Sequence, residues 1–552
     1  MPFTRLAPVA LLLCAVNAAA QRAPSASDST KLAIDRVFTE WRSTEGPGCA
    51  VGVTRADGFH YEHGYGMANL ETGTPITPGS IFHVASVSKQ FTAMAVMLLA
   101  RDGKLSVDDD IRKYLPEIPN YGTTITIRHL LTHTSGLRDQ WELLALARGR
   151  FEEDRITEAD VMDIVPRQKA LNFLPGTEYA YSNTGFTLLG VIVKRVSGQS
   201  LKDFAAERIF RPLRMTSTHF HDDYTMLVPG RTSAYEPRAD SARWRVSIPN
   251  YDTYGATSLF TTVGDLLKWE ANFDTPVVGD AALLARMQTV TPLAGGDTSN
   301  YGFGLSVLPY RGARTVGHNG ADAGYRAYVG RFPDLGTNIA IACNAASANT
   351  TALAHGVANV VLGGTLTSEA LALPPTITVD TIALRRRAGV YVQPTTLQVV
   401  QLTMLNGGLV AGSRTGPPLI PLGDNRFRVG AQPGEIVFAN GEHAGFERRA
   451  PGALPMKFEW REPVRATRAV LGAYAGRYVS EELGGTVYRV AATDSTLELR
   501  TGTADPIVAR LVFANTFLGG GYTIQFAEIK GRIAGFDVTN GRVRHVMFTR
   551  IP

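Results

Sequence analysis

The chain has 552 residues, 44% of them hydrophobic and 19% charged, and its formal net charge is +5. This ordinary globular composition excludes a disordered chain, a collagen-like repeat and a coiled-coil rod, and roughly 100 to 200 residues per domain predicts two to four domains. Residues 380–552 account for the positive excess, with 21 Lys and Arg against 14 Asp and Glu. We interpret this excess as an arginine-rich solvated surface, and we expect no nucleic-acid partner.

The N-terminus has the pattern of a secretory signal peptide. Arg5 precedes an apolar run over residues 6–16, and three alanines at positions 18–20 form a small-residue cleavage site. We predict cleavage after Ala20, which makes residues 1–20 the signal peptide. The rest of the sequence has no stretch near the roughly 18 uninterrupted apolar residues that a membrane span needs. The protein is therefore expected to be exported, to a periplasm or out of the cell, without a membrane span.

Strand and helix patterns alternate in the first large segment, which we predict to be an α/β (α+β) domain over residues 21–370. Strands at both ends with helices between them suggest one sheet that contains both termini of the domain. A hairpin is expected around Asp57-Gly58. The expected strands are 50–55, 59–66, 301–308, 325–332 and 338–343, and the expected helices are 90–100, 157–167, 186–196, 263–273 and 351–362.

Two cysteines follow the predicted signal peptide, Cys49 and Cys343. Two are too few for a disulfide scaffold or for a zinc site made of cysteines. Both lie in strand-like segments, so a disulfide can form in an oxidising compartment if those strands are neighbours. Two buried free thiols are the alternative, and the sequence leaves both open.

The pattern of residues changes after a linker-like segment at residues 371–376. Alternating strand patterns with glycine-rich turns follow, and helical periodicity is almost absent. A weak repeat relates residues 388–393 to residues 475–480. We predict two β-barrels of lipocalin-like type, over residues 380–462 and 469–552, because closure removes exposed strand edges. A single β-sandwich is the alternative.

Several catalytic motifs are absent from the sequence. It contains no Gly-x-Ser-x-Gly elbow, His-Glu-x-x-His, Gly-x-Gly-x-x-Gly or Walker loop. His60 and His63 have metal-like spacing, but on a strand their side chains point to opposite faces. We therefore expect no metal and no organic cofactor.

One catalytic motif is present, Ser86-Val-Ser-Lys89, and it directly precedes the helix expected from Gln90. On a first helical turn, positions i and i+3 share a face, so the Lys89 ammonium can reach the Ser86 hydroxyl. A serine hydroxyl is a weak nucleophile until a base takes its proton or a cation lowers its pKa. The N–H groups at a helix N-terminus also stabilise a developing anion. Alone, this motif fits a capping serine and a surface lysine equally well.

Two further motifs stand in a consistent order with the first. Tyr181-Ser-Asn183 is the only Tyr-x-Asn in the chain, and His318-Asn-Gly320 precedes the strand expected at 325–332. With these three motifs the chain resembles the serine β-lactamase and penicillin-binding-protein superfamily. Residues 130–137 also match a segment of its class C-like and esterase-like members. The resemblance covers about residues 35–365 and implies a serine hydrolase that works through an acyl-enzyme.

The resemblance implies a role for each motif residue in the reaction. Ser86 would be the acylated nucleophile, and Lys89 would share its proton. Tyr181 would act as the base, as a phenolate held by Lys89. Because a free tyrosine titrates near about 10, a tyrosine base at neutral pH needs such a neighbouring cation.

The resemblance also implies the substrate contacts. Asn183 would hydrogen-bond the substrate amide, and Gly320 would let the substrate approach the edge strand. The backbone N–H groups of Ser86 and Ala321 would form the oxyanion hole.

His318 bears on the choice of substrate. The common third motif of the family carries Lys followed by Thr or Ser, which together hold a substrate carboxylate. Here a histidine with an ordinary pKa near about 6.5 replaces the lysine, and Asn319 replaces the hydroxyl. We therefore expect weaker carboxylate binding at this motif and little β-lactamase activity. A second match, His443-Ala-Gly445, falls in the β region and is interpreted as a turn.

A catalytic domain followed by two β-barrels is similar to the architecture of bacterial D-aminopeptidases. In that family a loop of the last barrel helps select the free amine of the substrate. Gly519-Gly-Gly521 has the composition of such a loop or of a plain hairpin turn. The preferred substrate is a small peptide or amide with an N-terminal D-residue. The alternatives are a D-Ala-D-Ala carboxypeptidase, a small-ester hydrolase, and a non-catalytic protein that binds peptidoglycan fragments; the oligomeric state is left open.

Overall fold

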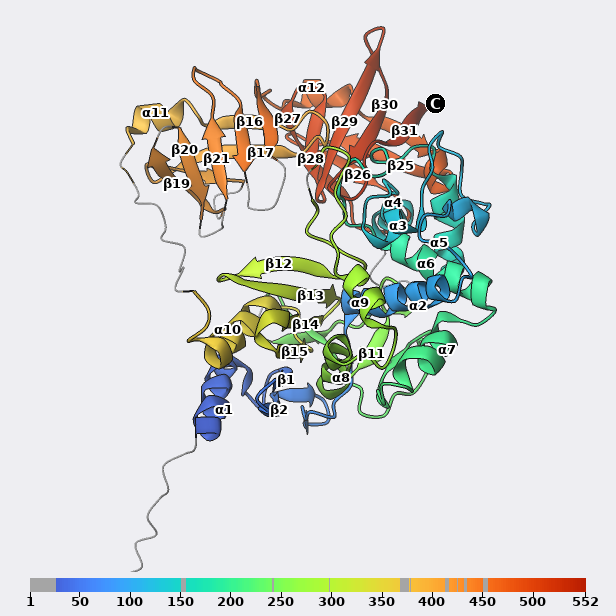
Figure 1. The fold of residues 1–552 in the computed structure, drawn as a ribbon. Coiled ribbons are helices and arrows are strands. Elements are labelled where there is room, and N and C mark those ends of the chain that lie inside the picture. The colour runs from blue at the N-terminus through green and yellow to red at the C-terminus, as the bar shows by residue number, and fades with distance from the viewer. Residues whose placement is uncertain are drawn as a thin grey trace, which may run out of the picture.

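The structure is a computed structural model that describes residues 26–552, except 150–154, 241–242, 297, 368–376, 378, 413–415, 424, 431–433 and 450–454. The predicted signal peptide and the linker at 371–376 lie outside the described residues. A domain of helices and sheets comes first in the chain, and two β-barrels follow it (Figure 1). In the part of the chain that the structure describes, no helix has the length and hydrophobicity to cross a membrane.

A six-stranded antiparallel sheet is the centre of the first domain, with the strand order β12-β13-β14-β15-β1-β2. The N-terminal hairpin pairs with a strand from the end of the domain, as the sequence predicted. Helices α1 and α10 pack on one face and α8 packs on the other. The strands are β1 (Cys49–Arg55), β2 (His60–Tyr65), β12 (Ser306–Tyr310), β13 (Ala313–Asp322), β14 (Tyr325–Phe332) and β15 (Thr337–Cys343).

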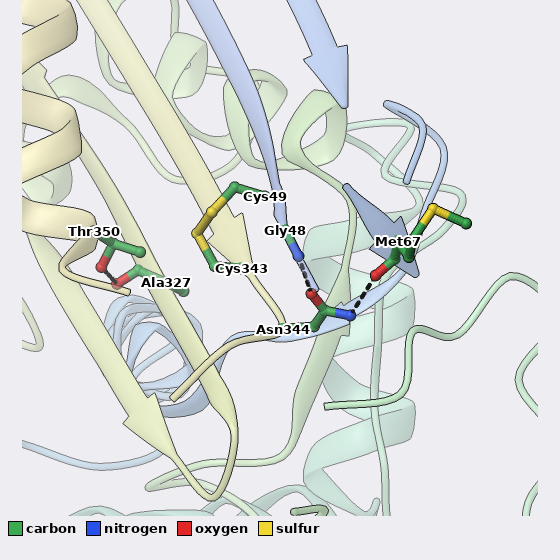
Figure 2. Close-up of a disulfide and its surroundings, with 7 residues drawn as sticks. All are labelled: Gly48, Cys49, Met67, Ala327, Cys343, Asn344 and Thr350. Atoms are coloured by element: carbon green, nitrogen blue, oxygen red, sulfur yellow. Dashed lines mark hydrogen bonds between the residues drawn. A yellow bond between two sulfur atoms is a disulfide. The ribbon is translucent and has the colours of Figure 1, made fainter. Parts of the chain in front are cut away.

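The two cysteines lie directly opposite each other in the paired strands β1 and β15 (Figure 2). They form a disulfide between positions 49 and 343, with a Cα–Cα distance of 4.0 Å. Asn344 follows at the end of β15, and its side chain accepts a hydrogen bond from Gly48 N–H (2.8 Å) and donates to the Met67 carbonyl (2.9 Å). The strand pairing that the sequence left open therefore joins the two cysteines.

The helical part of the domain lies beside the sheet and surrounds α2 (Lys89–Arg101). Nearly every residue of α2 is buried, because apolar side chains cover most of the helix on all sides and the polar Gln90 and Thr92 bond to neighbouring segments. The short strands β3 to β11 pair with one another in small sheets. The other helices are α1 (Ala26–Val37), α3 (Ile127–Leu131), α4 (Gln140–Arg148), α5 (Glu158–Ile164), α6 (Asn183–Ser197), α7 (Leu201–Ala205), α8 (Val263–Asp274), α9 (Ala281–Met287) and α10 (Thr350–Leu362). The short strands are β3 (Met67–Asn69), β4 (Thr74–Pro75), β5 (Phe82–His83), β6 (Ile156–Thr157), β7 (His219–Phe220), β8 (Tyr235–Pro237), β9 (Trp244–Val246), β10 (Tyr251–Asp252) and β11 (Leu259–Thr261).

Two closed eight-stranded antiparallel barrels form the rest of the chain, and the β-sandwich alternative is wrong. The repeated motif places a buried tyrosine at the same point of each barrel. Tyr391 donates to the carbonyl of Arg387 (3.0 Å), and Tyr478 donates to the carbonyl of Tyr474 (2.7 Å). The first barrel follows α11 (Thr381–Arg385) and comprises β16 (Gly389–Val392), β17 (Val399–Leu405), β18 (Gly408–Ala411), β19 (Pro418–Gly423), β20 (Arg426–Val429), β21 (Glu435–Phe438), β22 (Phe446–Arg449) and β23 (Met456–Arg461). The second follows α12 (Arg468–Gly472) and comprises β24 (Gly476–Ser480), β25 (Thr486–Ala492), β26 (Leu497–Arg500), β27 (Ile507–Phe513), β28 (Thr516–Gly519), β29 (Tyr522–Ile529), β30 (Arg532–Thr539) and β31 (Val546–Ile551).

The second barrel packs against the first domain around α3 to α6 (Figure 1), and its core is continuous with the core of that domain. At the centre of this contact, Arg138 Nη1 lies 2.6 Å from Glu482 Oε1. Only 1% and 4% of these two side chains are exposed. The first barrel in turn bonds to the second, where Arg510 donates to the side chain of Gln401 (2.8 Å). The second barrel is thus the one fixed beside the helices that surround the predicted active site.

Candidate active site

Ser86 lies on the 3-10 turn η2 (Ala85–Ser88), which leads directly into α2. Lys89 is the first residue of α2, and its side chain is fully buried. The Lys89 ammonium donates to Ser86 Oγ (3.1 Å) and to the Ala256 carbonyl (2.7 Å). The i, i+3 spacing therefore brings the two groups together. Ala85 has a φ of 48°, an uncommon conformation for a residue with a side chain, directly before the predicted nucleophile.

Burial sets the charge of Lys89. Loss of hydration lowers the pKa of this side chain to about 7, and the Asp139 carboxylate opposes that shift. A lysine in water is almost fully charged at neutral pH, whereas a lysine with a pKa near 7 is neutral in about half of the molecules. Lys89 can therefore accept a proton from Ser86 at neutral pH.

Tyr181 lies beside Ser86 and Lys89 and is half-buried. Its ring centroid is 4.8 Å from Lys89 Nζ, and its hydroxyl lies near Ser86. Burial raises the pKa of the Tyr181 phenol well above its ordinary value. The three predicted catalytic residues are thus in contact, but burial favours a neutral phenol and a neutral amine over the phenolate and ammonium of the sequence hypothesis.

Asn183 begins α6 and connects Lys89 to a carboxylate. Its Oδ1 accepts from Lys89 (2.9 Å), while its Nδ2 donates to Asp139 Oδ2 (2.9 Å). The same carboxylate oxygen accepts from the Asn183 backbone N–H (2.6 Å). Asp139 was not predicted from the sequence. One signal for it was available, because Asp139 caps α4 by accepting a hydrogen bond from Trp141 N–H (3.0 Å).

The edge of β13 passes beside Ser86. His318-Asn-Gly320 precedes β14 at the expected residues, Tyr325–Phe332, but it also lies within β13, which was not predicted because glycines and an asparagine weaken the strand pattern there. β12 pairs with β13 only as far as Gly317, which leaves the following residues beside η2. A Cβ atom at position 320 would lie 2.2 Å from the Val84 carbonyl oxygen and 3.2 Å from Ser86 N. Gly320 therefore permits the close approach, and Ala321 follows with its side chain exposed.

His318 is buried and does not offer a positive charge. Its Nδ1 bonds to the Asn319 carbonyl (2.5 Å), which can only accept, so Nδ1 is the donor. Nε2 is then the acceptor and takes a hydrogen bond from the Tyr301 hydroxyl (2.9 Å). Burial lowers the pKa of His318 to about 3, so the ring is neutral at neutral pH. Tyr301 is a second residue that the sequence analysis missed.

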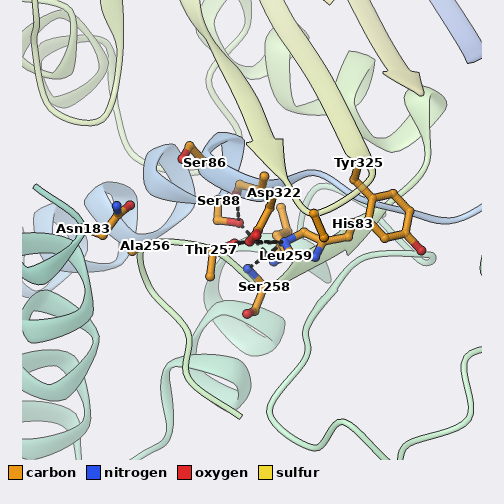
Figure 3. Close-up of polar contacts among 12 residues, drawn as sticks. His83, Ser86, Ser88, Asn183, Ala256, Thr257, Ser258, Leu259, Asp322 and Tyr325 are labelled. Carbon is orange, nitrogen blue, oxygen red and sulfur yellow. Dashed lines mark hydrogen bonds and ion pairs between the residues drawn. The ribbon is translucent and has the colours of Figure 1, made fainter. Parts of the chain in front are cut away.

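Figure 3 shows the polar contacts that fix the turn of Ser86 to neighbouring strands. Ser88, inside the catalytic motif, donates to the Ala85 carbonyl (2.5 Å) and accepts from Leu259 N–H of β11 (3.0 Å). The Thr257 hydroxyl donates to Asp322 at the end of β13 (2.9 Å). These contacts connect η2 to β11, and the residues just before β11 to the end of β13, around the predicted nucleophile.

A known protein family matches the part of the chain that holds this site. The Beta-lactamase family model matches residues 34–361, which is more than half of the chain. The chain belongs to the Beta-lactamase family. This membership confirms the resemblance that the three motifs indicated, and the protein is a serine hydrolase.

Relatives and solved structures of this family carry similar domains. The D-aminopeptidase of Brucella canis is 29% identical over 384 residues, which span 69% of this chain and 71% of the relative. The D-aminopeptidase of Gluconobacter oxydans is 30% identical over 285 residues, or 51% of this chain and 53% of the relative. The octameric penicillin-binding protein homologue from Pyrococcus abyssi has a TM-score of 0.56 at 22% identity, covering 78% of this chain and 99% of that one. The D-amino acid amidase from Ochrobactrum anthropi has a TM-score of 0.52 at 23% identity, covering 61% and 99%.

The second barrel brings a loop to the predicted active site, and of the two alternatives for Gly519-Gly-Gly521 the plain hairpin turn is the correct one. Gly519-Gly-Gly521 forms the turn of the hairpin β28–β29, where positions 519 and 522 pair. The segment 540–545, between β30 and β31, instead lies at Asp139 and Tyr181. One signal for this loop was present, since Asn540-Gly541 is a hairpin dipeptide followed closely by two arginines.

The remaining candidates lie away from the nucleophile. His60 lies on β2 and bonds to Glu62 (3.0 Å). Among the residues that the structure describes, no group of three or more His, Cys, Asp or Glu side chains could hold a metal ion. His443 stacks on Trp460 in the first barrel, with ring centroids 4.0 Å apart.

Proposed function

We propose that this serine hydrolase cleaves short peptides or amides with an N-terminal D-residue, through an acyl intermediate on Ser86. The observation that carries the chemistry is a buried Lys89 with a pKa of about 7, hydrogen-bonded to Ser86 Oγ. The substrate class is supported by D-aminopeptidases that are 29% identical over 69% of the chain. The two barrels that follow the catalytic domain support the same substrate class.

The proposed acylation step uses the neutral Lys89 amine and the neutral Tyr181 phenol. Neutral Lys89 takes the proton of Ser86 while Oγ bonds to the substrate carbonyl carbon. The oxyanion lies between the N–H groups of Ser86 and Ala321, at the point where β13 passes η2. Tyr181 passes its phenolic proton to the leaving nitrogen and receives one from Lys89, so the C–N bond breaks and a neutral amine departs. Lys89 and Tyr181 are both neutral again when the acyl-enzyme has formed.

Deacylation runs the same proton path in reverse. Water gives a proton to Lys89 through Tyr181 and attacks the ester, and Ser86 leaves with the proton that Lys89 holds. Asn183 and Asp139 act as positioning residues, because one amide bridges the lysine and the carboxylate. Asp139 therefore holds Asn183 in place and raises the pKa of Lys89.

Export is a second part of the proposal. The support is the pattern of residues 1–20, with a basic residue, an apolar run and a small-residue cleavage site. The disulfide between positions 49 and 343 fits an oxidising compartment.

The test uses protein that starts at Gln21, beside Ser86→Ala, with three substrates. Ser86-dependent release from D-alanine p-nitroanilide, with little from acetyl-capped D-Ala-D-Ala, is the expected result. Cleavage of only the capped dipeptide would instead identify a carboxypeptidase, and cleavage of only p-nitrophenyl acetate would identify an esterase. Turnover that persists in Ser86→Ala would exclude Ser86 as the nucleophile.

A further inference from the structure

The loop 540–545 of the second barrel is held at the active site by its own side chains. Asn540 donates to Glu142 of α4 (2.9 Å), and its Oδ1 accepts from Arg542 N–H (2.8 Å). Arg544 forms an ion pair with Glu178 (2.9 Å) and donates from its backbone N–H to Asn172 (2.7 Å). The residue between these anchors therefore has little freedom in its main chain.

Arg542 is the residue between the anchors, and its backbone carbonyl bonds to the site itself. The carbonyl accepts from Asp139 N–H (3.2 Å) and from Asn172 Nδ2 (2.8 Å). Asp139 is the carboxylate that holds Asn183 against Lys89. The position of Arg542 is thus fixed by the same residue that positions the catalytic lysine.

The side chain of Arg542 lies over the catalytic tyrosine. Its guanidinium carbon is 5.5 Å from the centroid of the Tyr181 ring, and the residue is exposed. None of the carboxylates in the described part of the chain forms an ion pair with it, whereas its neighbour Arg544 is paired with Glu178. A guanidinium held at a binding site without a carboxylate partner is suited to an anion from outside the protein.

The histidines near Ser86 do not supply a positive charge for an anionic ligand. His133 and His318 are buried, and burial lowers the pKa of both rings, so they are neutral at neutral pH. Asp139 is fully buried, and its oxygens accept N–H groups of Asn183 and Trp141. A neutral His318 cannot supply the cation for a carboxylate, so Arg542 is the positive group placed to do so.

We propose that Arg542 binds the carboxylate of the leaving group and makes the enzyme prefer peptides with a free C-terminus over their amides. This inference rests on the proposed function, since it assigns a partner to the leaving amine. Tyr181 delivers a proton to that amine, and Arg542 lies over the same ring. In a dipeptide the carboxylate carbon is two bonds from the leaving nitrogen, within about 2.5 Å of it. The guanidinium over Tyr181 is therefore next to the place where this carboxylate must lie.

The test compares D-alanylglycine with D-alanylglycinamide, which differ only in the terminal charge. A charge-assisted hydrogen bond predicts that Arg542→Gln lowers kcat/KM for the acid by about 10- to 100-fold and changes it for the amide by less than about threefold. Arg532→Gln is the matched control, because Arg532 is an exposed arginine at the far end of β30. It should leave both values unchanged. Equal losses on the two substrates, or no loss on the acid, would overturn the inference.

Two further measurements separate this inference from the proposed function. Calorimetry on Ser86→Ala should show that D-alanylglycine binds more tightly than its amide, and that adding Arg542→Gln removes the difference. Binding with that preference but no turnover by the native enzyme would refute the proposed function alone. Failure of Ser86→Ala to discriminate the two ligands would refute the role of Arg542. An Arg542-dependent preference for D-glutamyl over D-glutaminyl p-nitroanilide would place the carboxylate on the acyl side and overturn the assignment to the leaving group.

Discussion

The buried ion pair between Arg138 and Glu482 should control whether the second barrel stays on the catalytic domain. Arg138 also donates to Gln168 (2.9 Å) and to the backbone carbonyls of Arg544 (3.0 Å) and His545 (2.9 Å). Glu482→Gln keeps an acceptor of similar shape and leaves a buried guanidinium with neutral partners only. Breaking one side of a buried pair costs about 3 to 5 kcal/mol, and the retained acceptors favour the lower end, about 3 kcal/mol.

Urea unfolding followed by tryptophan fluorescence measures this cost. With an unfolding slope of about 3 kcal/mol/M, a loss of about 3 kcal/mol moves the midpoint down by about 1 M. Glu498→Gln on the same barrel is the matched control, since Glu498 pairs with Arg500 at the surface (2.8 Å). An exposed pair contributes less than about 1 kcal/mol, so its midpoint should move by less than about 0.3 M.

A second readout follows the barrel directly. If Glu482→Gln loosens the contact, trypsin should cleave faster after Arg542, because the loop 540–545 loses its anchors on the catalytic domain. The control variant should be cleaved at the native rate. A midpoint for Glu482→Gln that moves no further than that of Glu498→Gln would refute the reasoning. The attraction between the two charges would then not exceed the cost of burying them.

Three further predictions concern the catalytic centre. Because Lys89 acts in its neutral form and has a pKa of about 7, kcat/KM should be low at pH 5 and should rise through about pH 7 to a plateau; a flat profile from pH 5 to 9 would contradict this. Asp139→Asn removes a charge that raises the Lys89 pKa, so the rise should move to lower pH, and an unmoved or upward-moved rise would count against the assignment. Gly320→Ala should lower the rate of Ser86 labelling by a fluorophosphonate more than 100-fold, because its Cβ would overlap the Val84 carbonyl at 2.2 Å. Native labelling of a folded variant would refute that.

Local spacing made part of the site predictable from the sequence. Ser86 and Lys89 are three positions apart at a helix start, and this spacing alone brings their polar atoms to 3.1 Å. The hairpin around Asp57-Gly58 was predictable for the same reason, since a short turn with a glycine of positive φ at Gly58 fixes its own strands. Both features depend on a few neighbouring residues and not on the rest of the fold.

The features that the sequence analysis missed depend on long-range packing. Arg542 reaches Tyr181 only because the second barrel docks through contacts such as that of Arg138, more than 300 residues away along the chain. The charge states of Lys89 and Tyr181 were also out of reach, because burial sets them and no motif reports burial. The register between β1 and β15 was the third such feature. The sequence showed two strand-like segments with one cysteine each, but only the pairing of these two strands places Cys49 opposite Cys343.

The contact between the last barrel and the catalytic domain means that the candidate active site is built from two parts of the chain that are not adjacent in sequence. Its two parts are the first 365 or so residues and the last 85 or so, and the intervening barrel bonds to the later part. A truncated protein that ends with the family match at residue 361 would expose the Arg138 guanidinium and the apolar surface around α4. Such a fragment should aggregate or lose activity, whereas a chain that joins the catalytic domain to the last barrel keeps every contact described at the site.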